Sequence, residues 1–274
     1  MLGGSRPPAT APQRPMAAAA PAAHRCHHRG VARQTRTIDP VRPAELGIHA
    51  GLAYSLWAAE ASRAPAGGVV IIHGAGSCKE NHYDFARACV AHGLAAIAFD
   101  ARAHGASEGP MDGRIFEDVA EMATLLRDRT ARSDLPVALR GSSLGGYIAI
   151  IAAPLAAAAA AVAICPAGDE DLRRAVTSGR FDFDIDREAV EQLISANPLF
   201  AAVERLEVPL LLLHAEGDEQ VPVEQSRELA ERAQVPQSRL VTVPGGHHRS
   251  AQHDPELQAL TLRWLEQRFR AAGQ

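Results

Sequence analysis

Cysteine is scarce in this 274-residue sequence, and its four copies are irregularly spaced. No two of them form a CxxC pair, and four thiols in a chain of this length cannot build a dense disulfide framework. The spacing therefore predicts reduced thiols and a reducing compartment, which we expect to be the cytoplasm. The cysteines are Cys26, Cys78, Cys89 and Cys165.

An excess of charge of either sign is also missing. Lys and Arg total 28 against 32 Asp and Glu, which gives a formal net charge of −4, and Lys79 is the only lysine. A balance of this kind gives no general attraction to nucleic acid or to an anionic membrane. We therefore expect a small-molecule partner and no nucleic acid, while the oligomeric state is left open.

Long hydrophobic runs are missing as well, with one stretch that needs a closer look. Residues 147–167 carry no charge over about twenty positions, which is near the length that spans a bilayer. Pro154 interrupts this stretch, and most of its other residues are weakly hydrophobic alanines. A buried helix followed by a buried strand explains it better, so no membrane span is predicted.

The motifs that hold common cofactors and metals are not found. Neither a phosphate-binding P-loop nor a dinucleotide glycine fingerprint occurs, so no cofactor is predicted. Asp182, Asp184 and Asp186 alternate as in part of a calcium loop, but its glycine and terminal glutamate are missing. Asp186 is instead expected to cap a helix that begins near Arg187. The histidine- and cysteine-containing cluster at residues 24–28 matches no closed zinc site, so no metal is predicted.

The composition divides the chain into a tail and one domain. Residues 1–38 hold six arginines and no acidic residue, and little in them can form a core, which predicts a disordered basic tail. A targeting segment is the alternative for this tail. From residue 39 to 274, apolar strand-like runs alternate with amphipathic helical patterns, which predicts an α/β fold with a mostly parallel central sheet and helices on both faces. A more polar stretch at about 167–208 predicts a small cap or lid insertion.

One short turn carries the first chemical signal. Residues 141–145, GSSLG, fit the pattern G-x-S-x-G with Ser143 at the centre, between a predicted strand and a predicted helix. A serine on such a sharp turn has strained backbone, and its neighbours two residues away must be small. Gly141 and Gly145 meet that requirement, so Ser143 is the candidate nucleophile.

Two later strand ends supply a candidate acid and base. Asp218 follows the apolar run LLLLHAEGD, and His247 and His248 follow VTVPGG. The chain order Ser, Asp, His is the order expected for an α/β-hydrolase, and the carboxyl ends of parallel strands meet at one edge. His248 is favoured as the base because it fits a G-x-x-H loop, and His247 is the second choice. Glu216 and Asp254 are the alternative acids.

Two backbone amides are candidate oxyanion donors. The loop HGAG follows a predicted buried strand and places the Ala75 N–H beside the predicted site. The Leu144 N–H comes directly after the nucleophile, at the start of a helix whose first amides have no helical partner. His73 is expected to brace this loop rather than to react.

These segments together resemble the α/β-hydrolase superfamily, in its serine esterase, acyl-hydrolase or serine-aminopeptidase-like branch, over roughly residues 50–270. The resemblance implies a triad of Ser143, His248 and Asp218, and it implies structural roles for Asp100, Arg102 and His104 in the segment FDARAHGASEG.

The predicted function is hydrolysis of carboxylic esters or thioesters with small to medium acyl groups through an acyl-enzyme intermediate. An amidase or peptidase of the same fold is the nearest alternative. A non-catalytic ligand-binding member, a perhydrolase and a carbon–carbon bond hydrolase are the others.

Overall fold

The computed structural model describes residues 40–58 and 64–272. Eight strands form one sheet in the order β1-β2-β4-β3-β5-β6-β7-β8. The pairs from β4 to β8 are parallel, whereas β2 runs antiparallel to both β1 and β4. The strands are β1 (Glu45–His49), β2 (Leu52–Trp57), β3 (Gly68–Ile72), β4 (Ala95–Phe99), β5 (Val137–Ser142), β6 (Ala160–Ile164), β7 (Leu210–Ala215) and β8 (Arg239–Val243).

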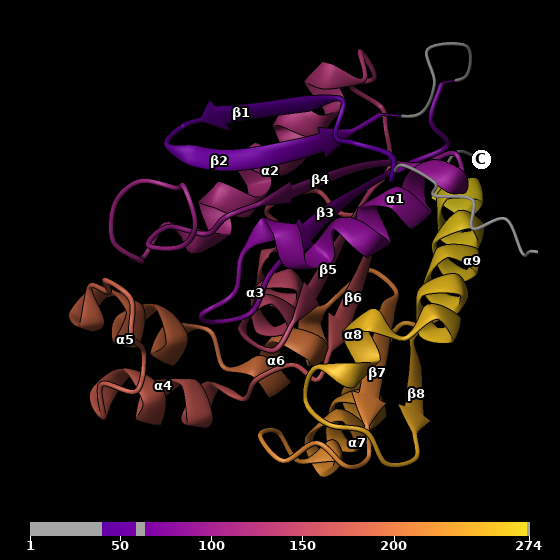
Figure 1. Ribbon diagram of the computed structural model, residues 1–274. Coiled ribbons are helices and arrows are strands. Elements are labelled where there is room, and N and C mark those ends of the chain that lie inside the picture. The colour runs from indigo at the N-terminus through magenta and orange to yellow at the C-terminus, as the bar shows by residue number, and fades with distance from the viewer. Residues whose placement is uncertain (1–39, 59–63, 273–274) are drawn as a thin grey trace, which may run out of the picture. The chain divides into compact units, whose positions relative to one another are not determined.

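Helices cover both faces of this sheet (Figure 1). Helices α1 (Tyr83–Ala91) and α9 (Pro255–Ala272) pack on one face, and α2 (Ile115–Arg129), α3 (Leu144–Ala152), α6 (Leu199–Arg205) and α7 (Val223–Arg232) pack on the other. The short helix α8 (Ser250–His253) precedes α9, and a 3₁₀ turn, η1 (Lys79–His82), precedes α1.

The central strands are apolar on both sides because both of their faces are covered. In β3, Val69 and Ile71 belong to the core under α1 and α9, while Val70 and Ile72 belong to the core under α2 and α3. All four side chains are at most 1% exposed. Strands buried in this way fix the positions of the loops at their carboxyl ends.

The uncharged stretch from 147 to 167 is a helix followed by a strand, as predicted. It contains the end of α3, a turn that includes Pro154, and β6. Among the described residues, no helix has both the length and the hydropathy required to cross a membrane.

The predicted α/β fold with a mostly parallel sheet is confirmed, but the edge strand β1 was not predicted. Leu46 and Ile48 of β1 are 68% and 61% exposed, and Gly47 lies between them. The predicted cap stretch contains α4 (Asp169–Thr177), α5 (Arg187–Ala196) and α6. Figure 1 shows α4 and α5 beside each other, away from the sheet. The predicted tail and the 24–28 cluster lie outside the described residues.

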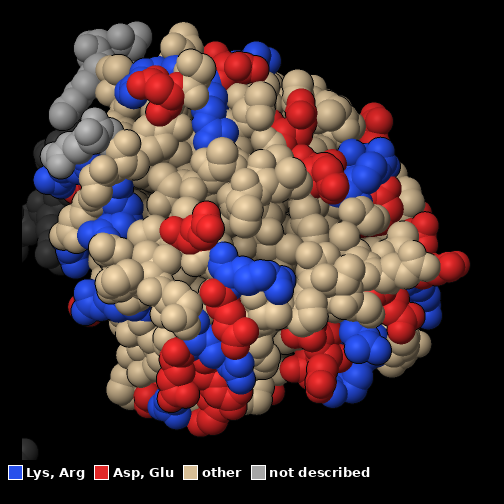
Figure 2. All heavy atoms as spheres, turned by 180° about the vertical axis from the view of Figure 1, so that it is seen from behind, with Lys and Arg blue, Asp and Glu red and all other residues tan. Residues whose placement is uncertain are grey.

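The two signs of charge are interspersed over the surface that Figure 2 shows, which is the face behind the view of Figure 1. Acidic and basic side chains lie next to one another around areas without charge. Exposed side chains of opposite sign also form ion pairs in the structure, for example Arg227 with Glu224 and Arg232 with Glu204. This mixture is consistent with the small formal charge of −4.

Candidate active site

Ser143 lies on a tight turn between β5 and α3. Its backbone has φ 55° and ψ −119°, a conformation that L residues rarely adopt. A Cβ atom on Gly141 would lie 1.8 Å from the Gly145 carbonyl oxygen, and one on Gly145 would lie 2.3 Å from the Ile72 carbonyl oxygen. Only glycine fits at either position, so the spacing of the motif has a direct steric cause. The Ser143 N–H donates to the Ile164 carbonyl at 2.9 Å, which ties the turn to β6.

Asp218 follows β7 and accepts several hydrogen bonds. Its Oδ1 accepts from the backbone N–H groups of Gln220 at 2.8 Å and Val221 at 3.0 Å. Its Oδ2 lies 2.7 Å from His248 Nδ1. Burial alone would raise the pKa of Asp218, but these hydrogen bonds hold the pKa below its ordinary value. The carboxylate is therefore ionised and fully enclosed at neutral pH.

The structure brings His248 rather than His247 to this carboxylate. The His248 residue is 6% exposed, and its backbone N–H is 3.3 Å from Glu219 Oε2. His247 is exposed, and its backbone N–H donates to Ser250 Oγ at 2.9 Å. Since both lie on one loop, the difference is one of direction: only the His248 ring turns toward the end of β7.

The two alternative acids are engaged elsewhere. Asp254 Oδ1 accepts from the backbone N–H groups of Glu256 and Leu257 in the first turn of α9, at 2.8 and 2.9 Å. Glu216 Oε1 accepts from Arg227 Nη2 at 3.2 Å and from the Thr242 hydroxyl at 3.1 Å. Neither carboxylate is placed at a histidine.

Ser143 and His248 line a common cavity of about 600 Å³. Its other walls come from the loop after β3, from α4 and the segment that follows it, and from the loops after β7 and β8. Ala75 and Leu144, the two predicted oxyanion donors, line the same cavity. A cavity of this size accommodates a small or medium ligand.

The backbone that carries the predicted oxyanion donors passes very close to the Ser143 turn. A Cβ on Gly74 would lie 3.3 Å from Ser143 Cβ and 3.1 Å from the Ser142 carbonyl oxygen. The Leu144 N–H is the first of α3, where no carbonyl one turn earlier in the helix accepts it. Ala75 and Leu144, which flank this close approach in the sequence, both line the cavity that contains Ser143.

Buried His73 braces this loop. Its Nδ1 donates to the Gly74 carbonyl at 2.7 Å, and its Nε2 accepts from the Ala101 N–H at 2.9 Å. Burial lowers the pKa of His73 to about 4, so the ring is neutral at pH 7. Both nitrogens are occupied, which agrees with the expected bracing role.

A second histidine connects the same loop to the predicted cap. His104 Nε2 accepts from the Gly76 N–H at 3.1 Å, and its Nδ1 donates to the Arg102 carbonyl at 3.0 Å. Burial lowers the pKa of His104. The Phe183 ring, from the segment between α4 and α5, lies 4.2 Å from the His104 ring centroid. In the same segment, the Met111 N–H donates to the Asp184 carbonyl at 3.0 Å.

Two buried ion pairs hold the segment around His104. Lys79 Nζ lies 2.6 Å from Asp100 Oδ2, and the Lys79 N–H donates to Asp100 Oδ1 at 2.8 Å. Arg102 binds both oxygens of Asp118, each at 2.8 Å. Asp100, Arg102 and His104 thus have the structural contacts that the resemblance implied.

Sequence reasoning missed two residues that surround Asp218. His214, inside the apolar run of β7, lies 3.5 Å from Asp218 Oδ2 through its Nε2 and 2.7 Å from Ser226 Oγ through its Nδ1. Cys165, directly after β6, has a positive φ of 43° and is fully buried. A histidine in an otherwise apolar strand was the signal for His214, whereas nothing in the sequence marked Cys165.

Among the described residues, Cys165, Asp218 and His248 are the one group of potential metal ligands whose atoms all lie within 4.8 Å of one another. The carboxylate and the imidazole already bind each other, and burial raises the pKa of the Cys165 thiol. This chemistry favours a hydrogen-bonded group over a metal site. The calcium-like alternation at 182–186 has a simpler role, because Asp186 Oδ1 caps α5 by accepting from the Ala189 N–H at 3.1 Å, as predicted.

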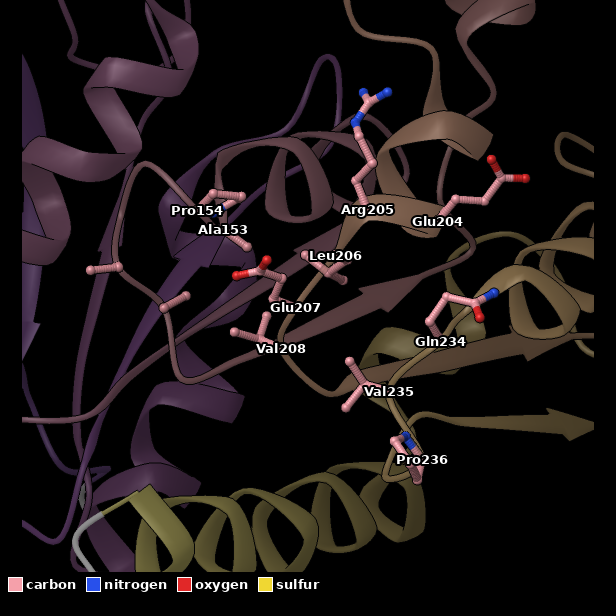
Figure 3. A pocket seen from close by; sticks show the side chains of 12 residues that line it. Ala153, Pro154, Glu204, Arg205, Leu206, Glu207, Val208, Gln234, Val235 and Pro236 are labelled. Atoms are coloured by element: carbon pink, nitrogen blue, oxygen red, sulfur yellow. The ribbon is translucent and has the colours of Figure 1, made fainter.

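A larger cavity of about 1060 Å³ lies at the other edge of the sheet, where β6 and β7 begin (Figure 3). Its walls include Pro154, Leu206, Val208 and Val235, and Figure 3 shows the Glu207 side chain extending in the direction of Ala153. None of the described residues that line it is a serine, cysteine or histidine. The cavity that contains Ser143 is therefore the candidate active site.

Comparison with known proteins agrees with this arrangement. A family model described as "Serine aminopeptidase, S33" matches residues 63–181, and one described as "TAP-like protein" matches residues 192–267. The chain belongs to the α/β-hydrolase superfamily. The two matched ranges of this α/β-hydrolase contain every residue of the predicted triad.

Solved structures share the α/β-hydrolase fold at low sequence identity. A monoglyceride lipase from Saccharomyces cerevisiae aligns with a TM-score of 0.67 at 13% identity, over 87% of this chain and 98% of that one. Est1E from Butyrivibrio proteoclasticus, solved with ferulic acid bound, aligns with a TM-score of 0.63 at 18% identity, over 84% and 100% of the two chains. An esterase from Pyrococcus furiosus gives 0.64 at 21% identity, over 83% and 91%.

A curated relative is the uncharacterized protein YqkD of Bacillus subtilis (strain 168). It is 24% identical over 197 residues, which cover 65% of this chain and 64% of that protein. The match therefore spans slightly less than two thirds of each of the two sequences.

Proposed function

We propose that this protein is a serine hydrolase that cleaves carboxylic esters or thioesters of small to medium acyl groups. The observation that carries the proposal is the 2.7 Å contact between His248 Nδ1 and Asp218 Oδ2, at the wall of a cavity that also contains the strained Ser143 turn. The ionised Asp218 accepts a hydrogen bond from the Nδ1–H group of His248, so the unprotonated Nε2 of His248 is available as the base.

The reaction then follows from these positions. His248 Nε2 takes the Ser143 hydroxyl proton as Ser143 Oγ bonds to the substrate carbonyl carbon. The resulting oxyanion accepts hydrogen bonds from the Ala75 and Leu144 N–H groups. The imidazolium gives its proton to the leaving alcohol or thiol as the acyl–leaving-group bond breaks. Water, deprotonated by the same histidine, attacks the acyl-enzyme, and Ser143 leaves with the proton returned.

The segment at about 167–208 is proposed as the cap of this site. Leu172 and Ala175 of α4, with Phe181 after it, form an apolar wall of the 600 Å³ cavity. A wall of this kind binds an acyl chain by removing its apolar surface from water. The monoglyceride lipase and the esterase that share this fold support an acyl substrate for this protein.

Covalent labelling with a fluorophosphonate tests the proposal directly. The wild-type protein is expected to be labelled once, on Ser143, and S143A is expected to lose both labelling and esterase activity. The matched control is S142A, which changes the neighbouring buried serine and should keep both. H248A and D218N should reduce kcat by roughly ten-thousandfold. Absence of labelling in the wild type would favour a ligand-binding protein without catalytic activity.

A peptidase or amidase is the second candidate, because the family model over residues 63–181 describes a serine aminopeptidase. The triad chemistry is the same, and only the leaving group differs. A panel of p-nitrophenyl esters of increasing acyl length, with acyl-CoA thioesters and aminoacyl anilides beside them, separates the two. If the protein hydrolyses only the anilides, it is an amidase or peptidase and the esterase assignment is wrong.

A further inference from the structure

An arginine is completely buried on the strand that leads to the nucleophile. Arg140, in β5, is 1% exposed, and burial lowers its pKa to about 10. Its guanidinium carbon lies 3.9 Å from the centroid of the Phe85 ring. Among the described residues no carboxylate forms an ion pair with it, and its Nε has no hydrogen-bond partner. The Asp84 carboxylate favours the charged form of Arg140 through space, but without a direct ion pair the burial of a guanidinium remains costly, so a specific contact must account for this residue.

Within the part of the chain that the structure describes, Arg140 makes one hydrogen bond, and it reaches the segment that carries the proposed base. Arg140 Nη2 donates to the Gln252 backbone carbonyl at 3.0 Å. Gln252 belongs to α8, which begins two residues after His248, and it also lines the candidate active site. The same carbonyl accepts from Gln258 Nε2 at 3.1 Å, so two donors meet at the end of this short helix.

The hydrogen bond from Arg140 to Gln252 restricts the loop before α8. Gly245 and Gly246 both have positive φ, and α8 is only four residues long, so the local sequence gives this segment little rigidity of its own. Asp218 fixes the direction of the His248 ring through Nδ1 but belongs to a different loop, after β7. A separate contact is required to set the spacing between the His248 segment and β5, which ends one residue before Ser143. Arg140 makes that contact, three residues before Ser143.

We propose that Arg140 is a positioning residue that holds the His248 segment at a fixed distance from the Ser143 strand. The proposal rests on the proposed function, since it assigns these two residues as base and nucleophile. A displacement of about 1 Å between such groups is sufficient to reduce a rate by two orders of magnitude. Arginine suits the task because it stays charged, stacks on an aromatic ring and donates in a fixed plane.

The variants are R140M, R140K and a matched control, R127M. Arg127 is a partly buried arginine that, like Arg140, donates to backbone carbonyls. Its acceptors are those of Leu135, Ala156 and Ala157, and it lies on α2, away from His248. Two measurements are made on folded protein, as checked by circular dichroism. The first is kcat and KM for p-nitrophenyl butyrate. The second is the downfield ¹H NMR signal of the His248 Nδ1 proton, assigned by its loss in H248Q.

We expect R140M to lower kcat by at least about tenfold with KM within about twofold, and to broaden or remove the downfield signal. R140K keeps a charge and a donor but lacks the planar fork, so a smaller loss of both is expected. R127M should keep the wild-type kcat and the downfield His248 signal. This should hold even if R127M lowers the melting temperature as much as R140M does.

The proposal is overturned if R140M keeps kcat within twofold and retains the signal, or if R127M loses them to the same extent. If R140M does not fold, R140K decides: wild-type kcat and an unchanged signal in R140K overturn the proposal. If the wild type hydrolyses no substrate, the proposed function fails, and the NMR signal alone then decides whether Arg140 positions His248.

Discussion

Acid should destabilise this protein through His73, and the size of the effect follows from its burial. The ring is neutral in the folded protein because burial lowers its pKa to about 4, whereas in the unfolded chain it has the ordinary value near 6.5. Between these two values the unfolded chain binds more protons than the folded one, so the free energy of unfolding decreases as the pH falls. The stabilising contribution is complete above about pH 6.5 and is lost progressively toward pH 4.

The difference of about 2.5 pKa units corresponds to about 3 kcal/mol, of which about 2 kcal/mol is lost between pH 7.0 and pH 4.5. Urea unfolding, followed by circular dichroism at both pH values, measures the loss. Other groups also titrate in this range, so wild type is compared with H73N, whose side chain carries no proton in it. The loss in stability from pH 7.0 to 4.5 should be about 2 kcal/mol smaller in H73N than in wild type.

A pH dependence in H73N equal to that of the wild type would refute the reasoning. It would mean that the His73 ring is solvated or charged in the folded protein, and that its bonds to Gly74 and Ala101 do not hold the loop as described.

Three further outcomes are expected. H247A should change kcat by less than about threefold while H248A removes activity, and the reverse result in a p-nitrophenyl ester assay would move the base to His247. G141A should lose fluorophosphonate labelling because the new Cβ meets the Gly145 carbonyl oxygen; full labelling would show that the turn relaxes at no cost. F181A should shift the preference in kcat/KM toward longer acyl esters by about one order of magnitude, since its ring forms part of the cavity wall; an unchanged chain-length profile would contradict the proposed cap.

The sequence was most informative where the chemistry is local. The spacing of Gly141, Ser143 and Gly145 reflects steric limits within five residues, and the structure shows the close contacts that impose them. The alternation of strands and helices also depends on local patterns, so the fold class could be read from it. The edge strand β1 escaped notice because Leu46 and Ile48 point to solvent and give no core pattern.

Contacts between distant segments were beyond local reasoning. The order of Asp218 and His248 along the chain suggested a meeting at the carboxyl ends of the strands, but the choice of one histidine over its neighbour depends on how the loop after β8 turns. Arg140 and Cys165 gave no signal, because their roles depend on what the folded chain places beside them. Burial of an arginine in an apolar strand cannot be inferred from the strand alone.

The pairing of Lys79 with Asp100 has a practical consequence for chemical modification. The printed sequence has no other lysine, and this one is only 8% exposed. Acetic anhydride and other reagents that acylate primary amines should therefore react with the Lys79 side chain only when the loop after β3 opens. The extent of acylation at Lys79, measured by mass spectrometry, would therefore report how often the contacts between Lys79 and Asp100 break.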